Sequence, residues 1–356
     1  MNNPMNNPMN NPKNNPMNNP MNHPMTDQRK EEAKKSFSRL AGILAGCIGI
    51  ITVLSIVASK VAEKMLSAEQ IGEMNVTLQM IVSIVTQYLI GYSVTFLLFS
   101  RMKGKKPEVK PIRTGEIVQL WMCCMAIMYG GNLLGTMLSS LLSGGQAENG
   151  LSNLAKSMNP LVMFVSVILA PVFEELIFRK CLIDRTAVYG EKISILFSAL
   201  CFGLFHMNLF QFFYAFGIGL IFGYIYMRSG KIIYTIALHI VVNFVGMVLS
   251  TLALGQLDMD KLQQFTESQG QNEQLLGEIL PGLMIFSVYM MAYFGVIIAG
   301  LILLIKKISQ KPVFEPKEKE LARQEAVGAM FGNVGMIIFI IVTGLMIVLS
   351  LFSPQG

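Results

Sequence analysis

Five side chains in three apolar segments could together catalyse hydrolysis. In chain order they are Glu174 and Glu175 in the first segment, His206 in the second, and His239 and Asn243 in the third. Ionisable groups are costly inside a bilayer, so they are rare there and are mostly functional. Acids, imidazoles and an amide spread over three such segments indicate acid–base chemistry within a membrane.

The composition is that of a polytopic helical membrane protein. Hydrophobic residues make up 53% of the 356 residues, charged residues make up 14%, and the mean hydropathy is +0.52. These values exclude an ordinary soluble domain. The net charge of +6 does not indicate nucleic-acid binding, because most basic residues lie in short loops beside apolar segments. The five cysteines have no spacing typical of a zinc site or a disulfide framework, so we interpret them as free, buried thiols.

The hydropathy predicts an all-α transmembrane bundle of about nine spans, since about 20 apolar residues cross a bilayer. Lys and Arg collect in every second loop, which places the N-terminus in the cytoplasm and the C-terminus outside. The turn near 208–211 is very short, so the fifth and sixth spans could instead form a tight or partly re-entrant hairpin. The predicted spans are 40–59, 78–100, 117–142, 161–183, 193–209, 211–227, 232–254, 282–305 and 333–352.

Four regions are expected along the chain. Six tetrapeptide repeats of the Met-Asn-Asn-Pro type fill the first 24 residues, and proline at every fourth position prevents regular structure. We interpret this tail as disordered and His23 within it as inert. The regions are a tail over 1–27, N-terminal membrane helices over 28–154, a catalytic core over 155–255 and C-terminal membrane helices over 256–356.

The polar groups of the core agree in depth. Counting 1.5 Å per residue from the cytoplasmic ends of the spans, Glu174 lies about 15 Å deep, His206 about 20 Å and His239 about 12 Å. Asn243 lies one turn beyond His239. Unrelated buried polar residues are not expected to agree in this way, which favours one shared site over three separate helix contacts.

Helix geometry distinguishes the two acids. Residues four apart share a helix face, so Glu175 can pair with Arg179 and has a structural interpretation. Glu174 points away from Arg179, which leaves it free to act as a base. His239 and Asn243 are also one turn apart and can direct two donors at one oxyanion. Gln87, Tyr88 and Asn132, together with Trp121, are interpreted as packing residues.

The spacing of these motifs resembles that of the CAAX-processing and bacteriocin-processing (CPBP) intramembrane proteases. The three motifs are Glu174-Glu175-x-x-x-Arg179, Phe202-x-x-x-His206 and His239-x-x-x-Asn243, preceded by Ala170-Pro171. The resemblance covers roughly residues 155–250. It implies that Glu174 and His206 activate water, that His239 and Asn243 hold the oxyanion, and that Arg179 and Phe202 support the site.

Whether a metal takes part is left open by the resemblance, since the family has been described both as metal-dependent and as glutamate-dependent. The helical zinc motif His-Glu-x-x-His is absent from the sequence. A reaction without a cofactor is favoured. The alternative is zinc held by Glu174, His206 and His239.

The predicted function is therefore that of an intramembrane endopeptidase in the cell membrane, acting on membrane-bound peptides or proteins. A non-catalytic scaffold or sensor that regulates a partner, or a bacteriocin self-immunity protein, is the alternative. The basic loops next to the catalytic spans lead to a further expectation, that the site opens toward the cytoplasm and toward lipid.

Overall fold

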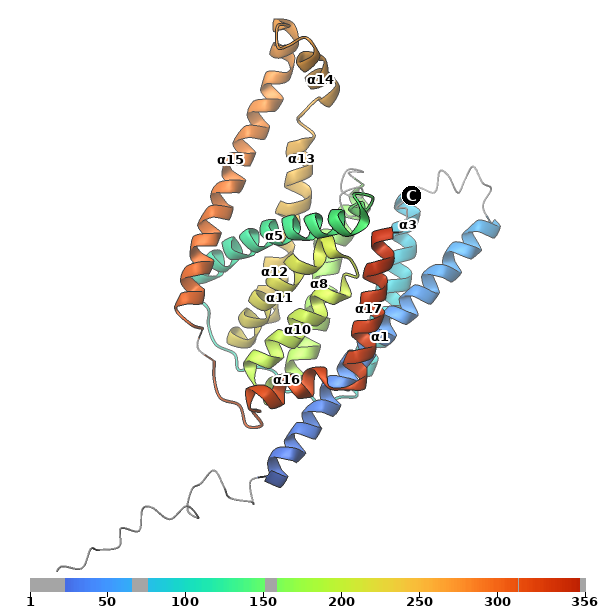
Figure 1. Ribbon diagram of the computed structural model, residues 1–356, viewed down its shortest axis with the longest axis vertical. Helices are drawn as coiled ribbons and strands as arrows, with labels where there is room; N and C mark the ends of the chain where they lie inside the picture. Colours follow the sequence, from blue (N-terminus) through green and yellow to red (C-terminus); the bar gives the residue numbers. More distant parts are fainter. Residues whose placement is uncertain (1–22, 66–75, 151–158, 313, 353–356) are drawn as a thin grey trace, which may run out of the picture.

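The computed structural model describes residues 23–65, 76–150, 159–312 and 314–352, and all regular elements in these ranges are helical (Figure 1). Eight helical stretches are long and apolar enough to cross a membrane, which confirms the predicted fold class. They are Asp27–Val61, Thr77–Ser100, Thr114–Ser143, Pro160–Tyr189, Leu209–Ser229, Ile232–Leu254, Glu273–Ser309 and Val334–Phe352.

The first and fifth predicted elements differ from the sequence-based expectation. Helix α1 (His23–Met65) begins inside the range assigned to the tail, so residues 23–27 are helical, while residues 1–22 lie outside the described part. The predicted span 193–209 is helix α10 (Glu191–Phe205), whose 15 residues cover about 22 Å and fall short of a bilayer core of about 30 Å. Its short length places the following turn inside the apolar layer.

Helix α10 and helix α11 (Leu209–Ser229) form a close hairpin at the centre of the molecule. A Cβ on Gly219 would lie 3.0 Å from Cα of Ala199, and one on Gly223 would lie 3.0 Å from the Ile195 side chain. Glycine at both positions therefore lets the two backbones approach closely, as the small-xxx-small spacing predicts. Around this hairpin lie α8 (Ala170–Glu175) and α12 (Ile232–Asn243), which carry the remaining candidate site residues.

Two outer groups of helices flank the hairpin (Figure 1). On one side, α1 packs with α17 (Val334–Phe352), where the Gly335 amide donates to the Ser38 hydroxyl at 3.0 Å. On the other side, α5 (Thr114–Ser143) packs against α11 and against α15 (Glu273–Ser309). Helix α15 leans away from the bundle and meets the short helix α14 (Met259–Glu267) at the far end of the molecule.

Proline and wide helical turns interrupt the regular helix beside the candidate acids. Segment η5 (Val165–Leu169) and segment η6 (Leu176–Ile183) are π-helical and bracket α8, and the π-helical η8 (Phe244–Leu249) follows α12. The Ala170 amide donates to the carbonyl of Val165, five residues back. Such wide turns are frequent at functional sites because they shift side chains and free carbonyl groups.

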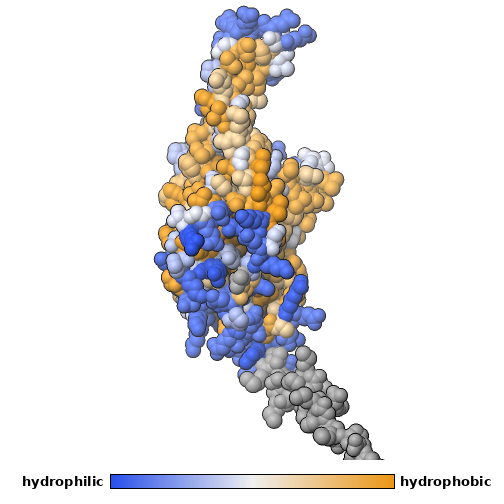
Figure 2. All heavy atoms as spheres, turned by 90° about the vertical axis from the view of Figure 1, so that its left-hand side faces the viewer, coloured by the Kyte–Doolittle hydropathy of each residue, from blue (hydrophilic) through white to orange (hydrophobic). Residues whose placement is uncertain are grey.

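Polar surface lies at the two ends of the molecule, with apolar surface between them (Figure 2). At the end that carries the basic loops, the segment after α15 is tied to the helices by ion pairs. Lys317 contacts the buried Glu191 at 2.7 Å, and Lys110 contacts Glu315 at 2.6 Å. The hydrogen bond from Lys110 holds the pKa of Glu315 below its usual value. We refer to this end as the basic end and to the other as the far end.

Candidate active site

A cavity of about 730 Å³ lies between the helices, and Glu174, His206, His239 and Asn243 all line it. The structure thus brings together the four residues to which the sequence analysis assigned chemistry. Glu175 is the exception, because its side chain is completely buried behind His239 and does not line the cavity. The Glu174 side chain is 17% exposed, so its carboxylate is accessible from the cavity.

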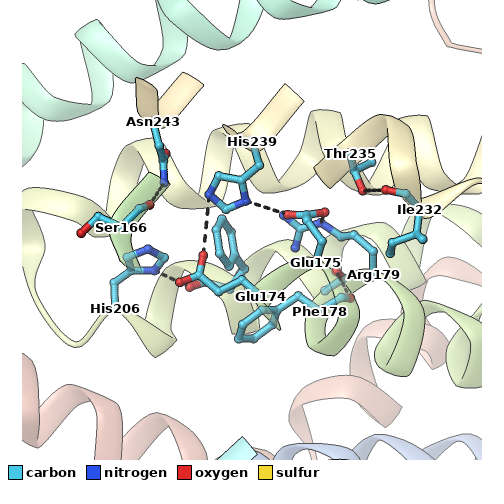
Figure 3. Close-up of polar contacts among 12 residues, drawn as sticks. Ser166, Glu174, Glu175, Phe178, Arg179, His206, Ile232, Thr235, His239 and Asn243 are labelled. Atoms are coloured by element: carbon cyan, nitrogen blue, oxygen red, sulfur yellow. Dashed lines mark hydrogen bonds and ion pairs between the residues drawn. The ribbon is translucent and has the colours of Figure 1, made fainter. Parts of the chain in front are cut away.

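Four charged or titratable side chains form a continuous row (Figure 3). Nε of Arg179 lies 3.1 Å from Oε2 of Glu175, and both side chains are completely buried. Oε1 of Glu175 accepts from Nδ1 of His239 at 3.0 Å. Nε2 of His239 in turn lies 3.6 Å from Oε2 of Glu174. Because a carboxylate only accepts, the contact with Glu175 places a proton on Nδ1 and directs Nε2 toward the cavity.

The predicted pairing of Glu175 with Arg179 is present, but it is only part of the role of Glu175. Its second oxygen orients His239, which sits 64 residues away in the sequence. The i,i+4 rule identifies only contacts within one helix, so the sequence could not reveal this one.

His206 lies at the C-terminal end of α10, where the chain turns into α11. Its Nδ1 faces the Phe202 carbonyl at 2.8 Å and must be the donor, since a carbonyl only accepts. The neutral ring therefore carries its lone pair on Nε2. The Asn208 side chain pairs with backbone groups of the turn. It donates to the His206 carbonyl at 2.8 Å and accepts from the Gln211 amide at 2.9 Å. Backbone groups in an apolar layer require such partners.

Asn243 is held by a backbone carbonyl that lacks its usual helical hydrogen-bond donors. The Ala170 amide bonds to Val165, and the next residue, Pro171, has no N–H, so the Ser166 carbonyl lacks these two helical donors. The Asn243 Nδ2 donates to this carbonyl at 2.9 Å (Figure 3). An amide nitrogen carries two hydrogens, so one remains for another acceptor. Pro171 thus contributes to the position of a residue 72 positions later in the sequence.

Phe202 packs at the centre of this group. Its ring stands edge-on to His206 and His239, with centroid distances of 4.9 and 5.8 Å, and the Arg179 guanidinium lies 4.5 Å from its centroid. Phe222 lies near the same guanidinium at 5.6 Å. The rings surround the buried cation with π faces, which attract it. The sequence motif included Phe202 but gave no indication of Phe222.

Three residues that were interpreted as packing residues also line the cavity. Gln87, Tyr88 and Asn132 belong to its wall, and the Gln87 amide donates to the Tyr92 hydroxyl at 2.8 Å. They come from helices outside the motif region, so no spacing rule connects them with Glu174. The one sequence feature that distinguished them was a polar side chain within an apolar segment.

The direction in which the site opens stays a prediction, and the side chains on the side of the basic loops are tightly packed. On that side of Glu174 lie Phe178, Arg179 and Phe202, which are 0–2% exposed. On this side the Phe202 ring lies 4.5 Å from the buried Arg179 guanidinium.

The described residues include no group of three or more His, Cys, Asp or Glu side chains arranged to hold a metal ion. The alternative zinc ligands Glu174, His206 and His239 all line this cavity, and Nε2 of His239 lies 3.6 Å from Oε2 of Glu174. The five cysteines are free and buried, as expected.

Comparison with known proteins relates this region to one family. Residues 156–245 match the family described as Type II CAAX prenyl endopeptidase Rce1-like. The chain is 28% identical over 121 residues to a Bacillus subtilis (strain 168) protein named "Putative membrane peptidase YdiL". That match covers 33% of this chain and 45% of the relative. No solved structure matches the chain significantly. The match of residues 156–245 to this family confirms the predicted CPBP relationship.

Proposed function

We propose that this membrane protein of the Rce1-like family is an intramembrane endopeptidase in which Glu174 activates the attacking water. The observation that carries the proposal is the contrast between the two adjacent acids. Glu174 is accessible from the cavity at 17% exposure and lies beside two imidazoles, while Glu175 is sealed and ion-paired. A carboxylate that contacts water in a cavity is suited to accept a proton from it.

In the first half of the reaction, Glu174 takes a proton from water while the water oxygen forms a bond to the scissile carbonyl carbon. The lone pair on Nε2 of His206 accepts a hydrogen bond from the same water and orients it. The electron pair of the C=O bond moves to its oxygen and gives an oxyanion. No step requires an oxidant or a further reactant.

The oxyanion receives two donors from α12. One is the Asn243 N–H that the Ser166 carbonyl leaves free, and the other is Nε2–H of protonated His239. Carboxylates at 3.0 and 3.6 Å from the His239 ring supply the counter-charge for that protonated form. Donors of this kind stabilise a tetrahedral intermediate strongly in a site of low dielectric. Glu174 then delivers its proton to the amide nitrogen, the C–N bond breaks, and an acid and an amine result.

The test compares peptide termini in membranes of cells that produce the wild type or Glu174→Gln. Glu278→Gln is the matched control, because Glu278 is on the surface of α15 and contacts Lys261 at 2.8 Å, far from the cavity. We expect a set of new termini in the wild type and the control that is missing with Glu174→Gln. Identical termini in all three samples would contradict the proposal and would favour a non-catalytic scaffold.

A further inference from the structure

The walls of the cavity extend from Glu174 toward the far end. Helix α12 begins directly after Lys231 at the basic end, and the cavity follows this chain from His239 to Thr251 and Leu254. Leu254 is 15 residues beyond His239, or about 22 Å along a helix. Gln211 lies in the first turn of α11, whose other end, at Ser229, adjoins the basic end. This part of the lining therefore lies beyond the candidate catalytic groups as seen from the basic loops, while Phe178 and Phe202 line the cavity on the side of those loops.

A second, smaller cavity of about 100 Å³ continues in the same direction. It shares Asn149 and Gln211 with the main cavity, and its wall also includes Asn208 and Ser350. These four side chains are polar and uncharged, and the acidic Glu148 also lines this pocket. The turn between α10 and α11 ends short of the far surface, so this polar pocket connects the buried turn with the loop that follows α5. Together the two cavities offer water a polar route to His206.

The lining has almost no charge. Among the described residues, Glu174, His206 and His239 are the charged or readily protonated side chains of the main cavity, and none of its residues is Lys, Arg or Asp. A free C-terminal carboxylate would find no Lys or Arg side chain there, because Arg179 is sealed behind Phe202. Burying an unpaired charge is costly, so the cavity disfavours chain ends and charged side chains.

The wall is well suited to an uncharged peptide. Gln87, Asn132 and Gln211 bear amide groups, which can pair with the N–H and C=O groups of an extended backbone. Apolar and aromatic walls between them, such as Met128, Tyr214 and Met247, can hold apolar side chains. Asn132 and Tyr129 are exposed on α5 and form part of the rim.

We infer that the cavity takes an internal, uncharged and apolar segment of a membrane peptide, which reaches Glu174 from the far end, the end opposite the basic loops. By the positive-inside rule this is the non-cytoplasmic side. The inference rests on the proposed function for the cleavage itself. The direction of access does not depend on cleavage and can be measured in an inactive variant.

Access is tested with single cysteines in the Glu174→Gln background and a membrane-impermeant maleimide applied to sealed vesicles of either orientation. The five native cysteines are buried, and the unsubstituted protein gives the background. Gln211→Cys and Thr251→Cys should label from the same side as Ser268→Cys, next to α14, and from the side opposite Lys103→Cys. Labelling of the cavity positions together with Lys103→Cys would overturn the direction.

Substrate class is tested with peptides whose termini the protein has been found to generate. Placing one Asp in the segment that spans the cut should lower cleavage at least about tenfold, and Asn132→Lys, which adds a cation at the rim, should recover part of this loss. Equal cleavage of the neutral and the Asp peptide by the wild type would overturn the inferred preference. Absence of cleavage of both peptides by the active protein would contradict the proposed function instead, while leaving the labelling result intact.

Discussion

At the scale of single residues, the site depends on the different surroundings of two adjacent glutamates. Glu174 borders a cavity and faces Nε2 of His239, whereas Glu175 bridges Arg179 and Nδ1 of the same imidazole. One carboxylate is thus available to accept and release protons, and the other fixes the orientation of His239. A carboxylate that accepts a hydrogen bond from one ring nitrogen of a histidine fixes which of the two nitrogens carries the proton.

Glu174→Gln and Glu175→Gln should therefore fail in different ways. Glu174→Gln should reduce cleavage by at least about 10²–10⁴-fold, the range of a lost general base, and leave the unfolding temperature close to wild type. Glu175→Gln should also lower stability, by about 3–5 kcal/mol, because it leaves the Arg179 cation buried without its partner. Thermal unfolding can be followed by the fluorescence of Trp121, the single tryptophan. A Glu175→Gln protein as stable as wild type would show that the ion pair is dispensable.

The metal question is also decided at the level of residues. We predict that the purified enzyme keeps its activity after prolonged treatment with a strong chelator, because Asn243 is an unfavourable zinc ligand but a good oxyanion donor. Metal analysis of the treated protein accompanies the assay. Loss of stoichiometric zinc together with activity, with both restored by added zinc, would establish the set of Glu174, His206 and His239 as ligands.

At the scale of elements, Pro171 explains how a break in one helix orients a side chain on another. Its missing N–H leaves the Ser166 carbonyl for Asn243. Proline inside a helix lowers the free energy of unfolding by about 3 kcal/mol. The arrangement therefore reduces stability but fixes the position of the Asn243 side chain. A trade-off of this kind is expected where activity needs a strained or irregular site.

Pro171→Ala should accordingly raise the unfolding temperature and lower turnover. The new N–H can bond to a carbonyl of its own helix and competes with Asn243, and misplacement by about 1 Å can cost on the order of 10²-fold in rate. Pro281→Ala is the matched control, since Pro281 lies inside α15 and away from the cavity. This control should gain stability without losing activity. Unchanged turnover of Pro171→Ala would show that the proline does not act through Asn243.

Features that lie within one helix could be predicted from the sequence, whereas contacts between two helices could not. Eight of the nine predicted spans follow from hydropathy alone, and the motif spacings identified every titratable residue of the cavity except its tyrosines. The contacts of Glu175 with His239 and of Asn243 with Ser166 join positions 64 and 77 residues apart. They depend on how helices are rotated against one another, which a single sequence does not encode in any local pattern.

At the scale of the whole molecule, the hairpin of α10 and α11 is held between two outer helix groups, and polar surface lies at both ends of the molecule. The direction in which the cavity faces also depends on packing between helices. Depth counts along single helices say nothing about which side of Glu174 the neighbouring aromatic residues cover. Phe178 and Phe202 close the basic side, and this follows from packing.

The N-terminal repeat should be dispensable for catalysis. The cavity wall begins at Ile48, and the titratable groups assigned to chemistry lie between residues 174 and 239. We predict that a protein without residues 1–22 cleaves at the wild-type rate when compared at equal amounts in the membrane. A truncated protein that is fully inserted but slower would show that the repeat contributes to the site.

The central claim is that Glu174 drives hydrolysis of a peptide bond, and the most direct measurement follows the oxygen of water into the product. Purified protein in lipid vesicles is given a peptide that spans an identified cleavage point, in water enriched in ¹⁸O. We predict one ¹⁸O atom in the new C-terminal carboxylate with the wild type and with Glu278→Gln, and none with Glu174→Gln. Incorporation at the same rate by Glu174→Gln would contradict the account.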